Sequence, residues 1–148
     1  MIIWAIIPAH NEELAISQTI RSLRKQTVKP QRIIVIIDNC SDLTEKMAKF
    51  EGAEIFITKN NKHKKAGAYN QFLQSIGKDE VDFLLLMDAD TIVARDAIEI
   101  GIERFQDQKV AAVCSKAGVQ KLQGCHNFFE NLYIVYKKLN MDYMIPLV

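Results

Sequence analysis

Two aspartates, Asp88 and Asp90, directly follow an apolar run that extends from Val81 to Met87 and is interrupted only by Asp82. A short run of this kind, with charged residues on both sides, is typical of a strand buried on both faces. The two carboxylates would then project from the carboxyl edge of a parallel sheet, where open α/β folds bind ligands. Neighbouring negative charges repel each other, and a divalent cation held by carboxylate oxygens relieves that repulsion. The first prediction is therefore a metal-dependent site for a phosphorylated donor.

Polar residues also follow three other predicted strands. They form the segments 8–13 (PAHNEE), 38–44 (DNCSDLT) and 65–70 (KAGAYN). An acid such as Asp38 at a strand end can accept hydrogen bonds from a ribose hydroxyl or a base N–H, as in nucleotide-binding α/β folds. Lys65 precedes small residues that open a predicted helix, and helix N-termini commonly bind phosphate. Each segment alone is a weak signal, but four in order on one sheet edge indicate a nucleotide site.

The composition is that of an ordinary globular domain. The 148 residues are 49% hydrophobic and 25% charged, which is enough for one domain with a substantial core. The 19 basic and 18 acidic residues give a net charge of +1, which favours neither nucleic acid nor an anionic membrane as main partner. A basic cluster within residues 59–65 is the exception, and two interpretations stay open: a solvated loop, or a surface that faces phosphate.

The cysteines and the N-terminal segment indicate the cellular compartment of the protein. Cys40, Cys114 and Cys125 are widely spaced and odd in number, which suits a reducing compartment better than a disulfide framework, and no spacing suggests zinc. The first apolar run lacks the basic region of a signal peptide and is too short to span a bilayer. We therefore expect a cytoplasmic protein, with attachment to the cytoplasmic face of a membrane and self-association left open.

Strand-like and helix-like segments alternate along the chain. Pro8 is expected to end the first strand, Asn11 to cap the first helix, and Leu14 to lie on the buried face of that helix. Either Ser41 or Asp42 would cap the second helix. The predicted strands are 2–7, 32–38, 54–58, 81–87 and 110–115, and the later helices are 43–50, 66–76, 95–105 and 127–139. This alternation predicts an α/β fold with a largely parallel sheet covered on both faces.

Three other folds that bind phosphorylated ligands match the sequence less well. No G-x-G-x-x-G follows the first strand, which argues against a nicotinamide dehydrogenase. The sequence also lacks the motif G-x-x-x-x-G-K-[ST], which argues against a P-loop enzyme. Phosphatases of the haloacid dehalogenase type also carry Asp-x-Asp after an apolar strand. Their motif normally lies on the first strand and continues with Gly-Thr, whereas here Thr91 directly follows Asp90 on the fourth.

Taken together, the segments 8–13, 38–44 and 65–70 with Asp88-Ala89-Asp90 resemble the inverting glycosyltransferases of family 2, which have the GT-A fold. The resemblance follows the family's order and spacing from the first strand to beyond the carboxylate pair. It implies a Rossmann-like, mostly parallel sheet and one domain over residues 1–148, without the C-terminal acceptor part. One departure is Asn39, where many members carry a second aspartate, although asparagine can still hydrogen-bond a nucleotide.

The resemblance also implies a role for each matching residue. The implied reaction transfers a sugar, with inversion, from a UDP-sugar to an acceptor hydroxyl on a glycan or lipid, with Mg²⁺ or Mn²⁺ bridging the donor phosphates. The donor residues would be Pro8, Ala9, Asn11 and Glu12 around the uridine, Asp38 and Asn39 at the uracil or ribose, Lys65 near the diphosphate, and Asp88, Ala89 and Asp90 beside the ribose and the metal. Asp90 would be the main metal ligand, with Asp88 beside it.

An inverting transferase also needs a base that takes the proton of the acceptor hydroxyl. The family's motif for this base is not recognisable here, and Glu130 and Asp142 are the remaining carboxylates of the last stretch. We expect the base to lie beyond Val148. The alternative function is a nucleotide-sugar-binding module that does not catalyse transfer, or that a partner completes.

Overall fold

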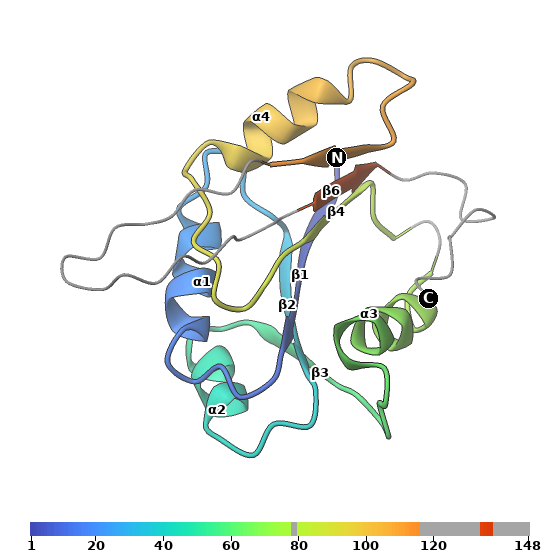
Figure 1. The fold of residues 1–148 in the computed structure, drawn as a ribbon. Helices are drawn as coiled ribbons and strands as arrows, with labels where there is room; N and C mark the ends of the chain where they lie inside the picture. Colours follow the sequence, from blue (N-terminus) through green and yellow to red (C-terminus); the bar gives the residue numbers. More distant parts are fainter. Residues whose placement is uncertain (78–79, 116–133, 138–148) are drawn as a thin grey trace.

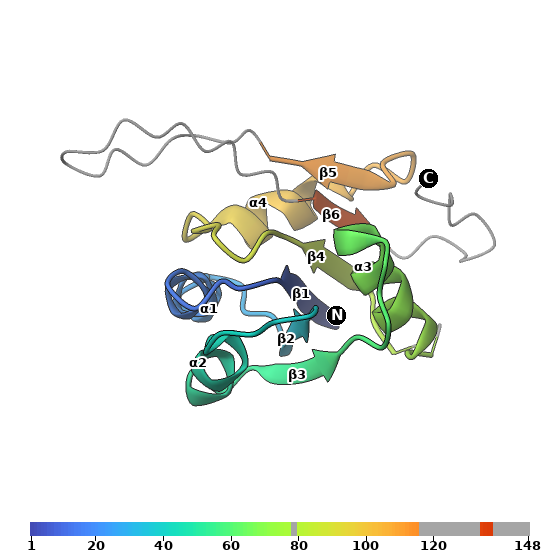
Figure 2. The same cartoon turned by 60° about the horizontal axis from the view of Figure 1, so that its bottom comes forward.

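The computed structural model describes residues 1–77, 80–115 and 134–137. Within them, strands and helices alternate and the strands form a single sheet with the order β3-β2-β1-β4-β6-β5 (Figures 1 and 2). The strands β3, β2, β1 and β4 are parallel, whereas β6 runs antiparallel to both of its neighbours. The elements are β1 (Ile3–Ala9), α1 (Ile16–Arg24), β2 (Arg32–Ile37), α2 (Thr44–Phe50), β3 (Glu54–Ile57), α3 (Lys64–Gln74), β4 (Phe83–Leu86), α4 (Ala97–Arg104), β5 (Ala112–Cys114) and β6 (Ile134–Lys137).

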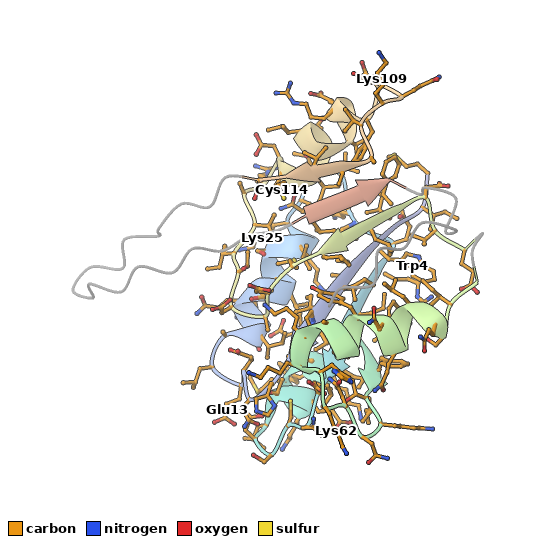
Figure 3. All side chains as sticks on the ribbon, turned by 45° about the vertical axis from the view of Figure 1, so that its right-hand side comes forward. Trp4, Glu13, Lys25, Lys62, Lys109 and Cys114 are labelled. Atoms are coloured by element: carbon orange, nitrogen blue, oxygen red, sulfur yellow. The ribbon has the colours of Figure 1, made fainter. Side chains whose placement is uncertain are left out.

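Helices cover both faces of the parallel part of the sheet, as the alternation predicts. One face, with Ile7 of β1, packs against α1, α2 and α4, and the other face, with Trp4 and Ile6, packs against α3. Figure 2 shows α1, α2 and α4 on one side of the strands and α3 on the other, and Figure 3 shows Trp4 on the α3 side. All of β1 is buried, which is why its sequence is an unbroken apolar run.

The first strand does not end at Pro8 as predicted but continues to Ala9, because the missing N–H of Pro8 costs no ladder bond. Ile6 accepts a hydrogen bond from Met87 on the β4 side, whereas Ala9 accepts one from Asp38 on the β2 side. Residues two apart on a strand face the same neighbour, so the nitrogen of Pro8 also faces the β4 side. Since β4 ends at Leu86, the proline nitrogen faces a part of that side with no strand to pair with.

The prediction that Asn11 caps the first helix is wrong. Asn11 has a φ of 56°, and its side-chain oxygen accepts a hydrogen bond from the Ser41 backbone instead. The backbone N–H groups of Glu12 and Glu13 are likewise bound by side chains of the second loop, so α1 begins only at Ile16. Leu14, predicted to be buried, is 91% exposed. Contacts between loops therefore outweigh the local capping signal.

The second helix, predicted over residues 43–50, spans Thr44–Phe50. Its N-cap is Leu43 without a side-chain cap hydrogen bond, so the prediction that Ser41 or Asp42 caps it is wrong. Asp42 instead accepts hydrogen bonds from the backbone and the hydroxyl of Thr44, the first residue of the helix. Gly52, which follows the C-cap residue Glu51, has a φ of 72°, the left-handed conformation that commonly ends helices.

The helix predicted over residues 127–139 is wrong where the structure describes it. Ile134–Lys137 form β6, which pairs with β4 on one side and β5 on the other. Without β6, β4 would present a row of unpaired backbone groups, and pairing them stabilises the strand. The β-branched and aromatic residues of this segment also suit a strand. The rest of the predicted helix lies outside the described residues.

Candidate functional site

The four polar segments meet at the carboxyl ends of β1, β2 and β4 and at the start of α3. They surround a hollow of about 520 Å³. Its lining residues are Pro8, Ala9, His10, Glu12, Asp38, Asn39, Asn61, Lys62, Lys64, Lys65, Asp88, Ala89 and Asp90. Of the residues predicted to bind the donor, only Asn11 is not part of this lining. The structure thus brings together side chains that lie up to 82 positions apart in the chain, from Pro8 to Asp90.

Asp38 is the buried centre of the site. It is 7% exposed, and its Oδ1 accepts hydrogen bonds from Thr58 Oγ1 at 2.8 Å and from Asn61 Nδ2 at 2.9 Å. The Asn39 side chain also donates to this oxygen, and His10 Nδ1 binds the Asp38 backbone carbonyl at 2.6 Å. A buried carboxylate needs such donors, because an unpaired one would carry a large desolvation cost. Asp38 therefore ties the loops after β1, β2 and β3 to one another.

The loop after β4 carries the two aspartates to the opposite wall of the hollow. Asp88 Oδ1 forms an ion pair with Lys65 Nζ at 2.5 Å, and Asp90 is exposed. Between them, the carbonyl of Ala89 accepts a buried hydrogen bond of 2.6 Å from Thr19 Oγ1 on α1. Sequence reasoning missed Thr19, because nothing near it in the chain marks it as part of a site.

Glu12 lies at the rim near several acids. Burial raises the pKa of its carboxyl, and the negative charges of Asp90, Asp42 and Asp88 raise it further, while His10 acts in the opposite direction. A raised carboxyl pKa in a cleft is a common property of functional sites. A cation at this position would offset the repulsion.

The carboxylates at the edge of the hollow suit a metal ion that binds together with a phosphorylated ligand. In the part of the chain that the structure describes, no group of three or more His, Cys, Asp or Glu side chains is placed to hold a metal by itself. Asp88 and Asp90 supply two carboxylates at the edge of the hollow. Mg²⁺ sites in enzymes that bind phosphate esters typically use one or two carboxylates, with substrate phosphates and waters as the other ligands. The donor set therefore suits Mg²⁺ or Mn²⁺ bound together with a diphosphate.

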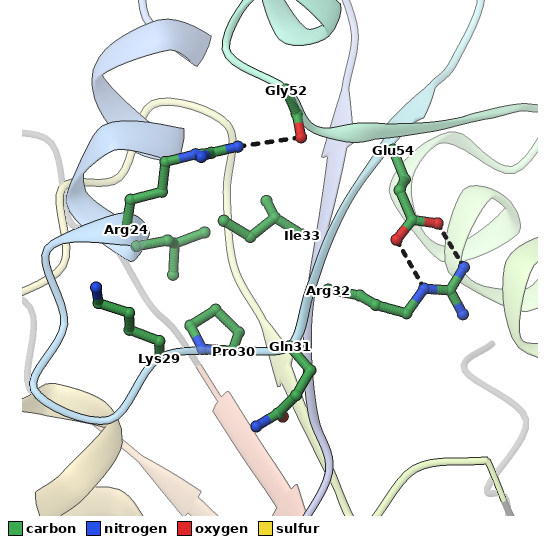
Figure 4. Close-up of a pocket in the computed structure, with 9 residues that line it drawn as sticks. Arg24, Lys29, Pro30, Gln31, Arg32, Ile33, Gly52 and Glu54 are labelled. Carbon is green, nitrogen blue, oxygen red and sulfur yellow. Dashed lines mark hydrogen bonds and ion pairs between the residues drawn. The ribbon is translucent and has the colours of Figure 1, made fainter.

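A second hollow, of about 280 Å³, lies at the amino ends of β2 and β3 (Figure 4). Arg32 on its wall forms two hydrogen bonds with Glu54, and Arg24 donates one to the Gly52 carbonyl. Much of the charge here is thus already paired. Open α/β sheets bind ligands at the carboxyl ends of their strands, so the larger hollow is the candidate site.

Comparisons with known proteins identify the family. The family model described as glycosyl transferase family 2 matches residues 4–140. The chain belongs to glycosyl transferase family 2. The poly-beta-1,6-N-acetyl-D-glucosamine synthase of Staphylococcus aureus is 32% identical over 112 residues, which are 73% of this chain and 26% of the synthase. The chain spans 35% or less of the length of the first curated relatives that it matches.

Solved structures of sugar-transferring enzymes share the fold of this chain. The glucosyl-3-phosphoglycerate synthase of Mycobacterium tuberculosis, in complex with Mn²⁺, UDP and phosphoglyceric acid, has a TM-score of 0.61 at 20% identity over 75% of this chain and 41% of its own. The mannosyltransferase PcManGT of Pyrobaculum calidifontis, in complex with GDP-Man and Mn²⁺, has a TM-score of 0.68 at 19% identity over 91% of this chain and 44% of its own. The fold is therefore GT-A, as the resemblance implied.

Two other predictions concern the acceptor base and a membrane-spanning helix. Glu130 and Asp142, the remaining carboxylates considered for the acceptor base, lie outside the described residues. Within residues 1–77, 80–115 and 134–137, no helix combines the length and apolar character needed to cross a membrane.

Proposed function

We propose that this chain carries the donor-binding part of a metal-dependent, inverting glycosyltransferase that takes its sugar from a UDP-sugar. The observation that carries the proposal is the hollow in which Asp88 and Asp90 face a lysine-rich segment and the buried Asp38. The synthase of Mycobacterium tuberculosis, which shares the fold, was solved with UDP and Mn²⁺, and this supports the choice of nucleotide and metal. PcManGT was solved with GDP-Man, so a guanine nucleotide is the first alternative to test.

The proposed roles follow the walls of the hollow. The uridine would lie against the loop after β1, with the uracil or ribose hydrogen-bonded by Asp38 and Asn39. Asp90, with Asp88, would hold Mg²⁺ or Mn²⁺ against the two phosphates. The complete set proposed for the donor is Pro8, Ala9, Asn11, Glu12, Asp38, Asn39, Lys65, Asp88, Ala89 and Asp90, with Asn11 acting through the loop that it holds.

The chemistry follows from charge. As the bond from the anomeric carbon to UDP breaks, negative charge grows on the departing diphosphate, and a bound divalent cation would offset that charge. Fixed basic side chains and backbone dipoles in a sheltered hollow add to this stabilisation. The acceptor hydroxyl would attack from the face opposite UDP while a base takes its proton, which inverts the configuration at the anomeric carbon.

We also propose that residues 1–148 act as one nucleotide-sugar-binding domain, with the acceptor side supplied by a further part or a partner. The short span of this chain relative to its curated relatives supports this proposal. The second candidate function, a binding module without transfer, rests on the same hollow, which would bind a donor whether or not transfer follows. Incubation with radiolabelled UDP-sugars and Mn²⁺ separates the two: released sugar or glycosylated product supports an enzyme, and binding without product supports the module.

The assignment of Asp90 can be tested by calorimetry. No hydrogen bond or ion pair within the described residues involves the Asp90 carboxylate, so Asp90→Ala is expected to fold normally. We expect wild type to bind UDP at least tenfold more tightly with Mn²⁺ than without, and Asp90→Ala to lose that gain, because a carboxylate ligand of the metal is absent. Asp96→Ala, which removes an exposed acid outside the hollow, serves as the control. Equal Mn²⁺-dependent binding by Asp90→Ala would contradict the assignment.

The nucleotide can be identified in a thermal-shift screen of UDP, GDP, CDP and dTDP, each with and without Mn²⁺. A rise in melting temperature with UDP plus metal alone supports the proposal. A rise with GDP instead would change the donor class, and no rise with any nucleotide would count against the site.

A further inference from the structure

Lys64 has a backbone conformation that lysine rarely adopts. Its φ is 49°, in the left-handed region, and the other described non-glycine residues with positive φ are the asparagines Asn11, Asn39 and Asn60. In this region the Cβ of any L-residue lies close to the following carbonyl, and asparagine tolerates it because its short polar side chain can hydrogen-bond locally, which a lysine side chain does not do. Lys64 is therefore the strained member of the group. Strain of this kind persists where the surroundings impose it, often at a binding site.

The surroundings impose this conformation through Asn61. The side-chain nitrogen of Asn61 donates to the Lys64 carbonyl at 2.7 Å and to the buried Asp38 at 2.9 Å, while its oxygen accepts from the His63 backbone at 3.0 Å. Gly67 lets this loop approach the first turn of α3, because a Cβ there would lie 2.0 Å from Asn61 Oδ1. The backbone of Lys64 is thus fixed to the same buried carboxylate that organises the hollow.

The three lysines that line the hollow are not equivalent. The ammonium of Lys65 is paired with Asp88. For the ammonium groups of Lys62 and Lys64, by contrast, no hydrogen bond or ion pair is formed with any residue that the structure describes, although both residues line the hollow. Figure 3 shows Lys62 at the end of the molecule where this loop lies. Lys62 itself has no positive φ, whereas the backbone carbonyl of Lys64 is held by Asn61.

We propose that Lys64, rather than Lys65, supplies the ammonium that binds the diphosphate of the donor. This inference rests on the proposed function and assigns a contact within that site. Lys65 then serves as the counter-ion of Asp88 and positions that carboxylate. The left-handed backbone of Lys64 is strained, and we infer that this strain is tolerated because it places a cation at the wall of the hollow. A glycine or asparagine at this position would remove both the strain and the charge.

Four variants test the inference with two readouts, the affinity for UDP in the presence of Mn²⁺ and the melting temperature. Lys64→Asn keeps a residue that tolerates positive φ but removes the charge, and it should weaken UDP binding about tenfold or more, the loss of one charge-assisted hydrogen bond. Lys64→Gly should weaken UDP binding similarly and raise the melting temperature by about 3 °C, because the strain is relieved. Lys64→Arg should keep the affinity within about threefold of wild type, because it keeps the charge. Lys65→Gln should weaken binding less than Lys64→Asn does.

Asn60→Gly is the matched backbone control. Asn60 has the same φ of 49° on the same loop but does not line the hollow, so this change should leave UDP affinity unaltered. Binding of uridine, which has no phosphate, should be equal in wild type and Lys64→Asn. Loss of uridine binding in Lys64→Asn would show a disturbed loop rather than a lost phosphate contact, and would overturn the inference.

The outcomes separate this inference from the proposed function. If wild type does not bind UDP with Mn²⁺, the proposed function fails, and the inference fails with it. If wild type binds UDP but Lys64→Asn binds equally well, or Lys65→Gln loses more affinity than Lys64→Asn, only the inference is wrong.

Discussion

The carboxyl group of Glu12 links the charge of the site to the stability of the fold. Burial, followed by the negative charges of Asp90, Asp42 and Asp88, raises its pKa above the usual 4.5. The folded chain therefore holds this proton more tightly than the unfolded chain does. The stability that this group contributes is present at low pH and is lost as the pH rises through the raised pKa. At neutral pH the ionised Glu12 weakens the fold.

We therefore expect Glu12→Gln to be more stable than wild type at pH 7, by less than about 1 kcal/mol because solvent screens this partly exposed group. The gain should disappear near pH 4, where the wild-type carboxyl is protonated. Urea unfolding at both pH values measures the difference, and Glu103→Gln, an exposed acid outside the hollow, is the control. A variant that is less stable than wild type at pH 7 would contradict the sign of the pKa shift.

At the scale of residues, the sequence predicts which polar side chains lie at the strand ends better than it predicts which residues hold those side chains in place. Asp38, Asp88 and Asp90 were predictable because acids directly after apolar runs must lie at a sheet edge. Asn61 was not, because its role depends on a contact with Asp38 from 23 positions away. The strain at Lys64 could not be predicted either, since φ depends on the surrounding loop.

Among the elements, α1 acts as a support for the loop that carries the two aspartates. Within α1, Thr19 donates to the Ala89 carbonyl and Ser22 Oγ accepts from the Val93 backbone. Just after the helix, Gln26 donates to the Ala94 carbonyl. These buried polar side chains replace the partners that the backbone of the loop lacks. The position of the carboxylates is therefore set from a helix on one face of the sheet.

Removal of one of these supports should affect both stability and binding. Thr19→Val keeps the shape of the side chain but leaves the Ala89 carbonyl without its donor, so we expect a loss of about 1–3 kcal/mol in unfolding free energy. UDP affinity in the presence of Mn²⁺ should fall several-fold, because the loop between Asp88 and Asp90 is held less firmly. Gln18→Ala on the exposed face of α1 is the control. Unchanged affinity in a destabilised Thr19→Val would show that the contact supports the fold alone.

Element types were largely predictable from the sequence, and the errors share a physical cause. The apolar runs indicated the positions of the parallel strands, and Gly52 marked the end of α2. The start of α1 and the nature of residues 134–137 were mispredicted because distant segments decide both. Asn11 binds the second loop, and residues 134–137 pair with β4.

For the whole molecule, β1 is the element on which both halves of the core depend. Ile7 is fully buried against α1 and its neighbours, so Ile7→Ala should lower the unfolding free energy by about 2–5 kcal/mol through lost burial and a residual cavity. Leu14→Ala, at a side chain that is 91% exposed, should change it by less than about 0.5 kcal/mol. Urea unfolding compares the two. An equal loss in Leu14→Ala and Ile7→Ala would contradict the exposure of the Leu14 side chain.

The pairing of β4 with β1 has a consequence for how the chain acquires its site. Ile3 pairs with Phe83, and two strands and three helices lie between β1 and β4 along the chain, so we expect this pairing to be late in folding. Contacts across such a separation form late in folding, because closing the chain costs entropy before the contact is gained. An incompletely folded chain can therefore hold the Asp38 side of the hollow while Asp88 and Asp90 are still absent from it. If the hollow binds a nucleotide with a metal as proposed, that binding would report the arrival of β4 in the sheet.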